Sequence, residues 1–98
     1  KKIRRDKLDM FLVLKAWSEK NRFKILNLLL RHDYCVRALS KKLGISEAAV
    51  SQHLKVLRKA GLLVGEKKGY YMHYRVNGQV LLKLAAMLEE LARIERQV

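Results

Sequence analysis

In the first half of this 98-residue chain the apolar residues recur at helical spacing. A first helix is predicted over about residues 6–17, where apolar side chains leave hardly any polar face. A second helix is predicted from a cap at Ser18 to about Arg31. Its apolar ladder consists of Phe23, Leu26 and Leu30, with Ile25 and Leu29 beside it. We therefore expect this second helix to be a buried structural element.

Two further helices are predicted close together, joined by a short turn that contains glycine. The first of them ends at Gly44, a predicted C-cap, and its apolar positions are Val36, Leu39 and Leu43. The next covers residues 46–60, between an N-cap at Ser46 and the glycine at position 61. Its core stripe consists of Val50, Leu54 and Leu57. Two helices joined in this way form a helix-turn-helix.

Beyond residue 61 the pattern changes from helical spacing to that of a β-hairpin. Apolar and polar positions alternate over residues 71–76, as in a half-buried strand. Gly69 can adopt the positive φ of a hairpin turn next to Lys67 and Lys68. A last helix is then predicted over residues 78–98, after the cap Asn77. The predicted fold is mainly α with a β-hairpin: a winged helix-turn-helix of about five helices and a two-stranded wing, in a single domain over residues 1–98.

The exposed side of the fourth predicted helix has the chemistry of a DNA-reading surface. At about 100° per residue, the positions opposite the core stripe are Ala48, Gln52, Lys55 and Lys59, with Ser51 on one flank. Amide and hydroxyl groups can read base edges, and lysines can contact phosphates. For a helix considered alone, an ordinary solvated face is the more common explanation of such residues. The hairpin favours DNA, because Lys67 and Lys68 on a wing can reach the DNA backbone or the minor groove.

The first and last helices, over about residues 6–17 and 78–98, are too apolar for one small domain to cover. We expect them to pack against the same pair of helices in a second subunit. The candidate residues of this dimer interface are Phe11, Leu14, Leu84, Met87, Leu88 and Leu91. A monomer with some exposed apolar surface is the alternative.

The charge of the chain restricts its partners. It has 22 Lys and Arg against 9 Asp and Glu, a net charge of +13 that predicts nucleic acid or, less readily, an anionic membrane surface as partner. Residues 77–98 contain 3 basic and 3 acidic residues, so the last helix is not expected to bind a polyanion. A single cysteine excludes an internal disulfide framework, and neither a signal peptide nor a membrane-spanning apolar run is visible. We expect a cytoplasmic protein without membrane contact.

Several motifs resemble those of the ArsR (ArsR/SmtB) family of winged-helix repressors. They are Val36-x-x-Leu39, Leu43-Gly44-Ile45-Ser46, the run from Ala49 to Leu63, and the hairpin that ends in Tyr74-Arg75-Val76. The resemblance spans nearly the whole chain, and the Ser-Gln-His-Leu-Lys-x-Leu block is highly specific. It implies a homodimeric repressor whose fourth helix reads double-stranded operator DNA. For a two-fold dimer the operator is expected to be an imperfect inverted repeat.

The resemblance also implies which positions read bases. In this chain they are Glu47, Ala48, Ser51 and Gln52. Glu47 and Ala48 stand where family members often have Gln and Ser, so the base preference of the family does not transfer. Glu47 could accept a hydrogen bond from a cytosine amine or simply stabilise the helix start. His53 matches the motif but projects toward the core side. We therefore interpret it as a helix-packing or phosphate contact in preference to a base reader.

The sensing chemistry of the family is not evident in this sequence. In the family that this chain resembles, metal-responsive members carry Cys-x-Cys at the start of the third helix, or Asp and His ligands on the last helix. Here Cys35 matches the first position and Arg37 occupies the second, while the last helix has no Asp, His or Cys. Because a thiophilic ion requires paired thiolates, we expect no metal site and no cofactor. Cys35 is interpreted as a small buried residue, with a redox-reactive thiol beside Arg37 as the alternative. The inducer is not predicted.

Other function classes fit the sequence less well. It contains no catalytic triad, paired acids in a cleft or phosphate-binding glycine loop, so we expect no enzyme. A winged helix that binds RNA or protein would also be small and basic, but would not need both an acid-poor reading face and two apolar terminal helices. A membrane-surface peptide would instead align its apolar residues along one stripe. The sequence predicts a sequence-specific DNA-binding transcriptional regulator, with a redox-responsive repressor sensing through Cys35 as an alternative.

Overall fold

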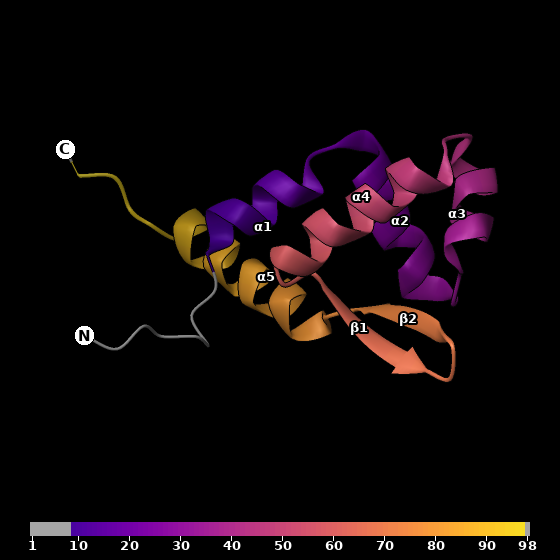
Figure 1. Ribbon diagram of the computed structural model, residues 1–98. Helices are drawn as coiled ribbons and strands as arrows, with labels where there is room; N and C mark the ends of the chain where they lie inside the picture. The colour runs from indigo at the N-terminus through magenta and orange to yellow at the C-terminus, as the bar shows by residue number, and fades with distance from the viewer. Residues whose placement is uncertain (1–8, 98) are drawn as a thin grey trace, which may run out of the picture.

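The computed structural model describes residues 9–97 and confirms the mainly α fold with one hairpin (Figure 1). The helices are α1 (Met10–Trp17), α2 (Lys20–Arg31), α3 (Val36–Leu43), α4 (Glu47–Lys59) and α5 (Gly78–Ala92), and the strands are β1 (Leu63–Lys68) and β2 (Tyr71–Val76). The predicted start of the first helix at about residue 6 lies outside the described residues. In the described part α1 begins at Met10, where the carboxylate of Asp9 accepts from the backbone N–H groups of Phe11 and Leu12.

The boundary between α1 and α2 differs from the prediction. Ser18 does not cap α2 but ends α1, with its backbone N–H donating to the carbonyl of Leu14 at 3.0 Å. Glu19 is the N-cap of α2, and its carboxylate accepts from the N–H of Arg22 at 2.9 Å. The Glu19 side chain is longer than that of the usual capping residues. It nevertheless reaches a free N–H in the first turn of α2 and satisfies it, as a Ser, Thr or Asp cap would.

The buried stripe of α2 is also rotated relative to the predicted ladder. Ile25, Leu26 and Leu29 are buried, whereas Phe23 and Leu30 are 52% and 50% exposed. The α2 face that packs against α3 and α4 is therefore centred between the two ladders considered in the sequence. Periodicity alone does not select between them, because both ladders recur at helical spacing.

The helix-turn-helix forms as its local signals predict. Gly44 ends α3 in the left-handed region with φ 70°. The hydroxyl of Ser46 then accepts from the N–H of Ala49 at 3.0 Å and starts α4. The predicted core stripe of α4 is confirmed, since Val50, Leu54 and Leu57 are buried. Cap and stripe together fix which side of α4 remains open to solvent.

The wing is an antiparallel pair in which Lys68 is the partner of Tyr71, so Gly69 and Tyr70 form a two-residue turn. Gly69 has φ 64°, the left-handed conformation that a hairpin with glycine at its first turn position requires. Lys67 and Lys68 belong to the end of β1 and not to the turn itself. The backbone N–H of Leu62 donates to the carbonyl of Leu57 at 3.0 Å, which holds the base of the hairpin against the end of α4.

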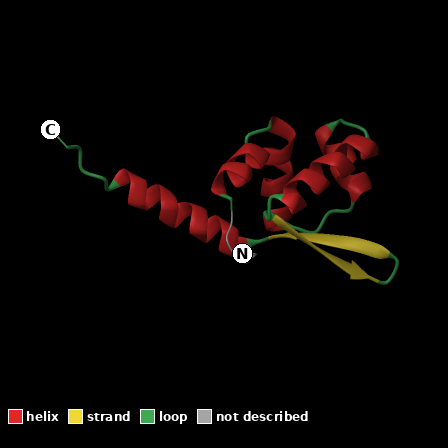
Figure 2. Ribbon diagram, turned by 60° about the vertical axis from the view of Figure 1, so that its left-hand side comes forward, coloured by secondary structure: helices red, strands yellow, loops and turns green. Residues whose placement is uncertain are grey.

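Helix α5 leaves the body of the molecule beyond its first two turns, as Figure 2 shows. Val80 and Leu84 are buried against the core, whereas Leu88 and Leu91 are 50% and 55% exposed. The helix ends at Ala92 and does not continue to residue 98 as predicted. Residues 93–97 are exposed, so no packed apolar face stabilises further helical turns in this part of the protomer. None of the described helices has the length and apolarity needed to cross a membrane.

Candidate nucleic-acid interface

The predicted reading residues lie on one exposed face of α4. Glu47, Ala48, Ser51, Gln52, Lys55 and Lys59 are all exposed. Glu47 is the sole acidic residue of the helix and lies in its first turn, where a negative charge is favourable. The rest of the face presents a hydroxyl, an amide and two ammonium groups, without an acid to repel phosphates. The structure thus brings together the α4 residues predicted from sequence, while their DNA contacts stay a prediction.

His53 lies on the opposite flank of α4, in a cluster with the start of α2. Its side chain is 19% exposed, and its Nδ1 lies 3.2 Å from Nη1 of Arg22 and 3.9 Å from Oε1 of Glu19. Arg22 also donates from Nε to the carbonyl of Ala16 at 2.6 Å. Arg22 therefore links the last turn of α1 to the middle of α4. This arrangement gives His53 a helix-packing role in the protomer and leaves it poorly placed to reach a base.

The same cluster changes the acidity of one group. The backbone N–H of Arg22, which donates to Glu19, holds the pKa of the Glu19 carboxyl below its ordinary value. Partial desolvation opposes this effect, and the nearby His53 and Arg22 side chains add to it. Glu19 is therefore a charged cap at the junction of α1, α2 and α4.

A hollow between α4 and the wing contains residues that the sequence did not single out. It has a volume of about 300 Å³ and is lined by Ser51, Lys55, Arg58, Lys59 and Tyr74. Arg58 lies in the last turn of α4, and Tyr74 lies in β2. The pairing of Tyr74 with Gly65 across the hairpin brings the two together. A sequence-based signal existed in Gly65, since glycine inside a strand often marks a close approach of another group.

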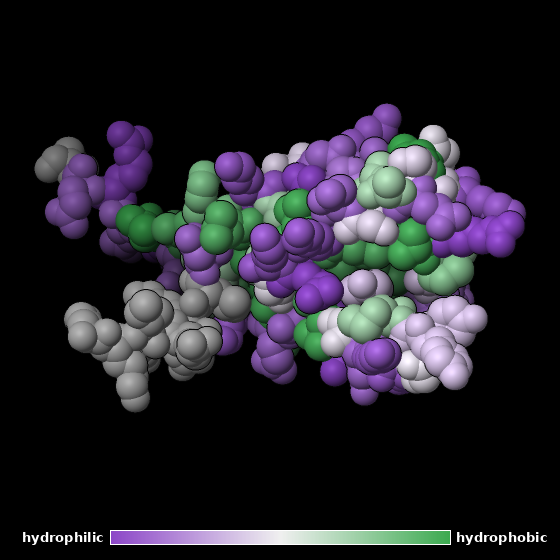
Figure 3. Space-filling view, in the orientation of Figure 1, coloured by the Kyte–Doolittle hydropathy of each residue, from purple (hydrophilic) through white to green (hydrophobic). Residues whose placement is uncertain are grey.

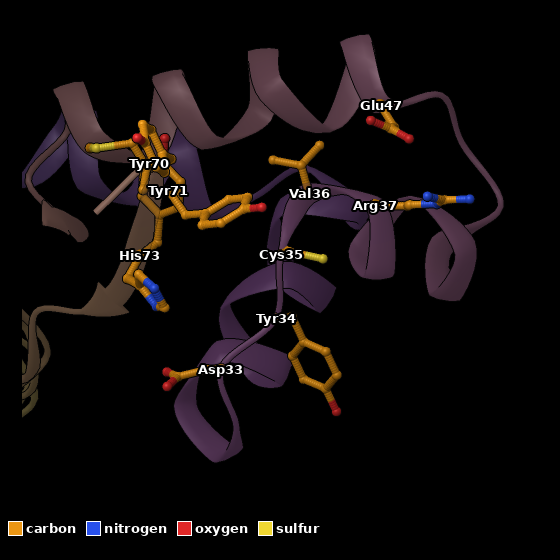
Figure 4. A pocket seen from close by; sticks show the side chains of 11 residues that line it. Asp33, Tyr34, Cys35, Val36, Arg37, Glu47, Tyr70, Tyr71 and His73 are labelled. Carbon is orange, nitrogen blue, oxygen red and sulfur yellow. The ribbon is translucent and has the colours of Figure 1, made fainter. Parts of the chain in front are cut away.

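A second hollow, of about 690 Å³, lies between the wing tip, the start of α3 and the start of α4 (Figure 4). Cys35 is part of its wall. The interpretation of Cys35 as a buried residue is wrong: the side chain is exposed, because it occupies the N-cap of α3 at the surface. Its Sγ accepts from the N–H of Ala38 at 3.4 Å. In Figure 4 the ring of Tyr71 points across the hollow toward Val36, whereas the Cys35 sulfur points away from Tyr71.

The described residues offer no ready metal centre. Between residues 9 and 97 no three His, Cys, Asp or Glu side chains are grouped so that they could hold a metal ion. His32 lies edge-on to Tyr34, and His53 contacts α2, so two of the histidines have other neighbours.

Most of the predicted dimer residues are exposed on the protomer. Phe11, Leu14, Leu88 and Leu91 have between 42% and 69% of their surface exposed, and Met87 is partly buried. Leu84 differs from these, because it is 7% exposed and packs into the core of its own chain. Figure 3 shows apolar side chains among hydrophilic ones at the end of the molecule that carries α1 and α5, and further apolar side chains across the rest of this face. The exposed apolar residues predicted for the interface thus lie on α1 and α5, whereas the predicted reading residues lie on α4.

Comparison with known proteins indicates the family to which the chain belongs. The pattern described as "Bacterial regulatory protein, arsR family" matches residues 19–64, from the cap of α2 to the start of the wing. The chain is 35% identical over 69 residues to the transcriptional repressor SdpR of Bacillus subtilis, covering 70% of this chain and 77% of that protein. It is 35% identical over 82 residues to the transcriptional activator HlyU of Vibrio cholerae, covering 84% and 73%.

The match to a third relative covers less than two thirds of that protein's length. The chain is 33% identical over 79 residues to the arsenic resistance transcriptional regulator ArsR1 of Pseudomonas putida, covering 80% of this chain and 62% of that protein. Similarity to solved structures extends over most of the chain. An ArsR-like transcriptional regulator from Rhodococcus sp. RHA1 superposes with a TM-score of 0.79 at 34% identity, covering 85% of this chain and 76% of the other.

The homodimeric winged helix-turn-helix DNA-binding domain of Mb0332 from Mycobacterium bovis also superposes, with a TM-score of 0.68 at 26% identity, covering 91% and 84%. Fold, surface and relatives together define a DNA-binding transcriptional regulator of the winged helix-turn-helix class, and not an enzyme. Within that class, the chain belongs to the ArsR family.

Proposed function

We propose that this chain acts as a homodimeric repressor that binds an operator with the form of an imperfect inverted repeat. In this function each subunit inserts α4 into a major groove, and the two grooves are about one helical turn or a small multiple apart. The dimer forms through α1 and α5. The proposal carries over the homodimeric assembly named for the Mycobacterium bovis domain and the repressor activity named for the Bacillus subtilis relative.

The observation that best supports the proposal is the separation of two surfaces on one small protomer. The α4 face is polar and basic, whereas the outer faces of α1 and α5 expose apolar side chains such as Phe11 and Leu91. A contiguous exposed apolar surface favours a protein partner, and an acid-poor basic surface favours nucleic acid. A symmetric pair of subunits satisfies both, because it buries the apolar faces and presents two copies of α4.

Different residues of this surface have different proposed roles. Ser51 and Gln52 read base edges, because hydroxyl and amide groups can donate to and accept from bases. Glu47 and Ala48 lie at the start of the helix, where a carboxylate can accept from cytosine and a small side chain permits close approach. Lys55, Lys59, Lys67 and Lys68 contact phosphates, which contributes affinity without sequence information.

The proposal is tested by binding assays at fixed salt with duplex DNA, RNA of the same sequence, and anionic lipid vesicles. The DNA probe is the region upstream of the coding sequence, searched for an inverted repeat, and the control is a scrambled duplex of equal length. We expect tight binding to the inverted repeat alone. Equal affinity for the scrambled duplex or for RNA would contradict a sequence-specific DNA regulator, and vesicle binding alone would indicate a membrane-surface protein.

The exposure of Cys35 supports a second candidate for how binding is regulated, namely oxidation of this thiol. Peroxide should then weaken operator binding in the wild type and leave Cys35→Ser unaffected. Zinc, cadmium and arsenite should have no effect in either, because Arg37 stands where a second thiolate would be needed. Equal peroxide responses of the two proteins would remove Cys35 as a sensor, and a large metal-induced loss of binding would refute the expected absence of a metal site.

A further inference from the structure

We propose that the hollow between α4 and the base of the wing binds one phosphate of the DNA backbone, with Arg58 and Tyr74 as its principal donors. This inference rests on the proposed DNA-binding function and adds a contact site to it. The site would receive the strand that passes from the major groove at α4 to the groove reached by the wing. Neither Arg58 nor Tyr74 belongs to the residues predicted from sequence to contact DNA.

The composition of the hollow fits an oxyanion. Its wall comprises Ser51, Lys55, Arg58 and Lys59 from one flank of α4, and Tyr74 from β2. These groups provide three cations, an alcohol and a phenol, and no carboxylate. Within residues 9–97 no acidic side chain forms an ion pair with Arg58, Lys55 or Lys59. Cations that are not neutralised by the protein are available to release counterions from DNA.

The geometry of the wing holds Arg58 and Tyr74 beside each other. A Cβ placed on Gly65 would lie 3.3 Å from Cε1 of Tyr74, 3.6 Å from Cδ of Arg58 and 2.9 Å from Cε of Met72. The Tyr74 ring and the Arg58 stem therefore cross the backbone of β1 where glycine leaves room for them. The guanidinium can donate in a fork to two phosphate oxygens, which is the geometry that distinguishes arginine from lysine.

The two hollows beside the wing differ in whether carboxylates line them, which argues for the position of the phosphate. Near the wing tip the larger hollow is lined by the carboxylates of Asp33 and Glu47, but also by Arg37 and His73, so its charges are mixed. Carboxylates there would repel a phosphate. Along α4 the wing-side flank thus changes from acidic at Glu47 to basic at Lys55 and Arg58, so the backbone is expected to approach the basic end.

The test uses the full chain and compares salt dependence on the operator and on a scrambled duplex. Arg58→Ala should weaken binding to both duplexes alike, by about tenfold or more, because a charge-assisted contact is lost in each subunit. The slope of log affinity against log salt should become shallower by about two, because a dimer carries the site twice and each phosphate contact contributes about 0.9. Arg58→Lys should keep the slope and lose only part of the affinity.

One further variant and one control separate the contact from a structural effect. Tyr74→Phe removes only the hydroxyl and should weaken binding a few-fold with an unchanged slope. Lys83→Ala removes an exposed charge from α5 and should bind like the wild type. Thermal unfolding of each variant checks that the fold is retained.

Duplexes with a single neutral methylphosphonate linkage locate the phosphate. At one position per half-site the substitution should weaken the wild type and have no further effect on Arg58→Ala. An additive loss at every position would overturn the inference, as would an unchanged salt slope in Arg58→Ala. If Lys68→Ala loses affinity in that same case, the DNA-binding function stands and only this site is refuted. If the wild type binds neither duplex, the proposed function itself fails.

Discussion

The helix-turn-helix and the terminal helices differ in how completely each is stabilised within one chain. Helices α3 and α4 have defined caps at both ends. The α4 stripe and Leu39 of α3 are buried in the protomer, and Val36 and Leu43 pack against that core. Helices α1 and α5 have caps as well, but each leaves several large apolar side chains exposed, such as Phe11 and Leu88. The helix-turn-helix is therefore stabilised within one protomer, whereas the terminal helices leave apolar surface unburied.

This difference separates the two tasks of the proposed function. Because α4 is held by its own core and caps, the orientation of its exposed face is set by contacts within the protomer. The terminal helices expose apolar surface that a second copy would cover, and their pairing would set the spacing between two α4 helices. Arg22 connects the two regions, since it donates to α1 and contacts His53 on α4.

The largest effect is expected from a charge placed on the exposed face of α5. Leu88→Glu should make the chain monomeric in sedimentation at micromolar concentration, because the dimer would bury an unpaired carboxylate. Operator affinity should fall by about 10²–10⁴, because two linked half-site contacts become one. Leu30→Glu is the matched control, since Leu30 is equally exposed on α2. A monomeric wild type, or equal losses in the two variants, would contradict the assigned interface.

A smaller effect is expected in the turn that orients α4. Gly44 has φ 70°, and an added Cβ would meet no atom within 4 Å. Gly44→Ala should therefore cost about 1–2 kcal/mol of unfolding free energy through its backbone conformation alone. Gly78→Ala at the start of α5 has equal space but no positive φ, so its effect should be neutral or slightly stabilising. Denaturant unfolding measures both, and equal destabilisation would show that the positive φ of Gly44 does not determine the cost of its substitution.

The smallest effect is the pH dependence of the Glu19 cap. Its pKa is lower in the folded state than in the unfolded chain, so the unfolded state takes up a proton first as the pH falls. The stabilisation is present above the ordinary glutamate pKa of about 4.3 and is lost as the pH drops through the folded value. The difference in melting temperature between wild type and Glu19→Gln should therefore shrink below about pH 4. A constant difference from pH 3 to pH 7 would contradict this role.

Local signals predicted most of the fold. Gly44, Gly61 and Gly69 all adopt the positive φ that their positions required. Ser46 and Asn77 cap the helices that they were expected to start. Each of these signals depends on one residue and its nearest neighbours in the chain, which is the information that a sequence contains directly.

Features that depend on how helices face each other were less predictable. The exposure of Phe23 and Leu30, and the burial of Leu84, follow from the rotation of whole helices against the core. The Arg58 and Tyr74 hollow depends on the hairpin register, which brings residues sixteen positions apart in the sequence to one groove. Alternation and helical periodicity in the sequence define candidate buried faces, but they do not determine which helices and strands pack together.

The most direct test of the account compares Gln52→Ala with Lys68→Ala on the operator and on a scrambled duplex at several salt concentrations. Gln52→Ala should cost about 1–3 kcal/mol on the operator and little on the scrambled duplex, because a hydrogen bond to a base edge is lost. Lys68→Ala should weaken both duplexes alike and make the salt dependence shallower. Equal loss on both duplexes for Gln52→Ala, together with an operator-specific loss for Lys68→Ala, would contradict the assignment of α4 as reader and the wing as anchor.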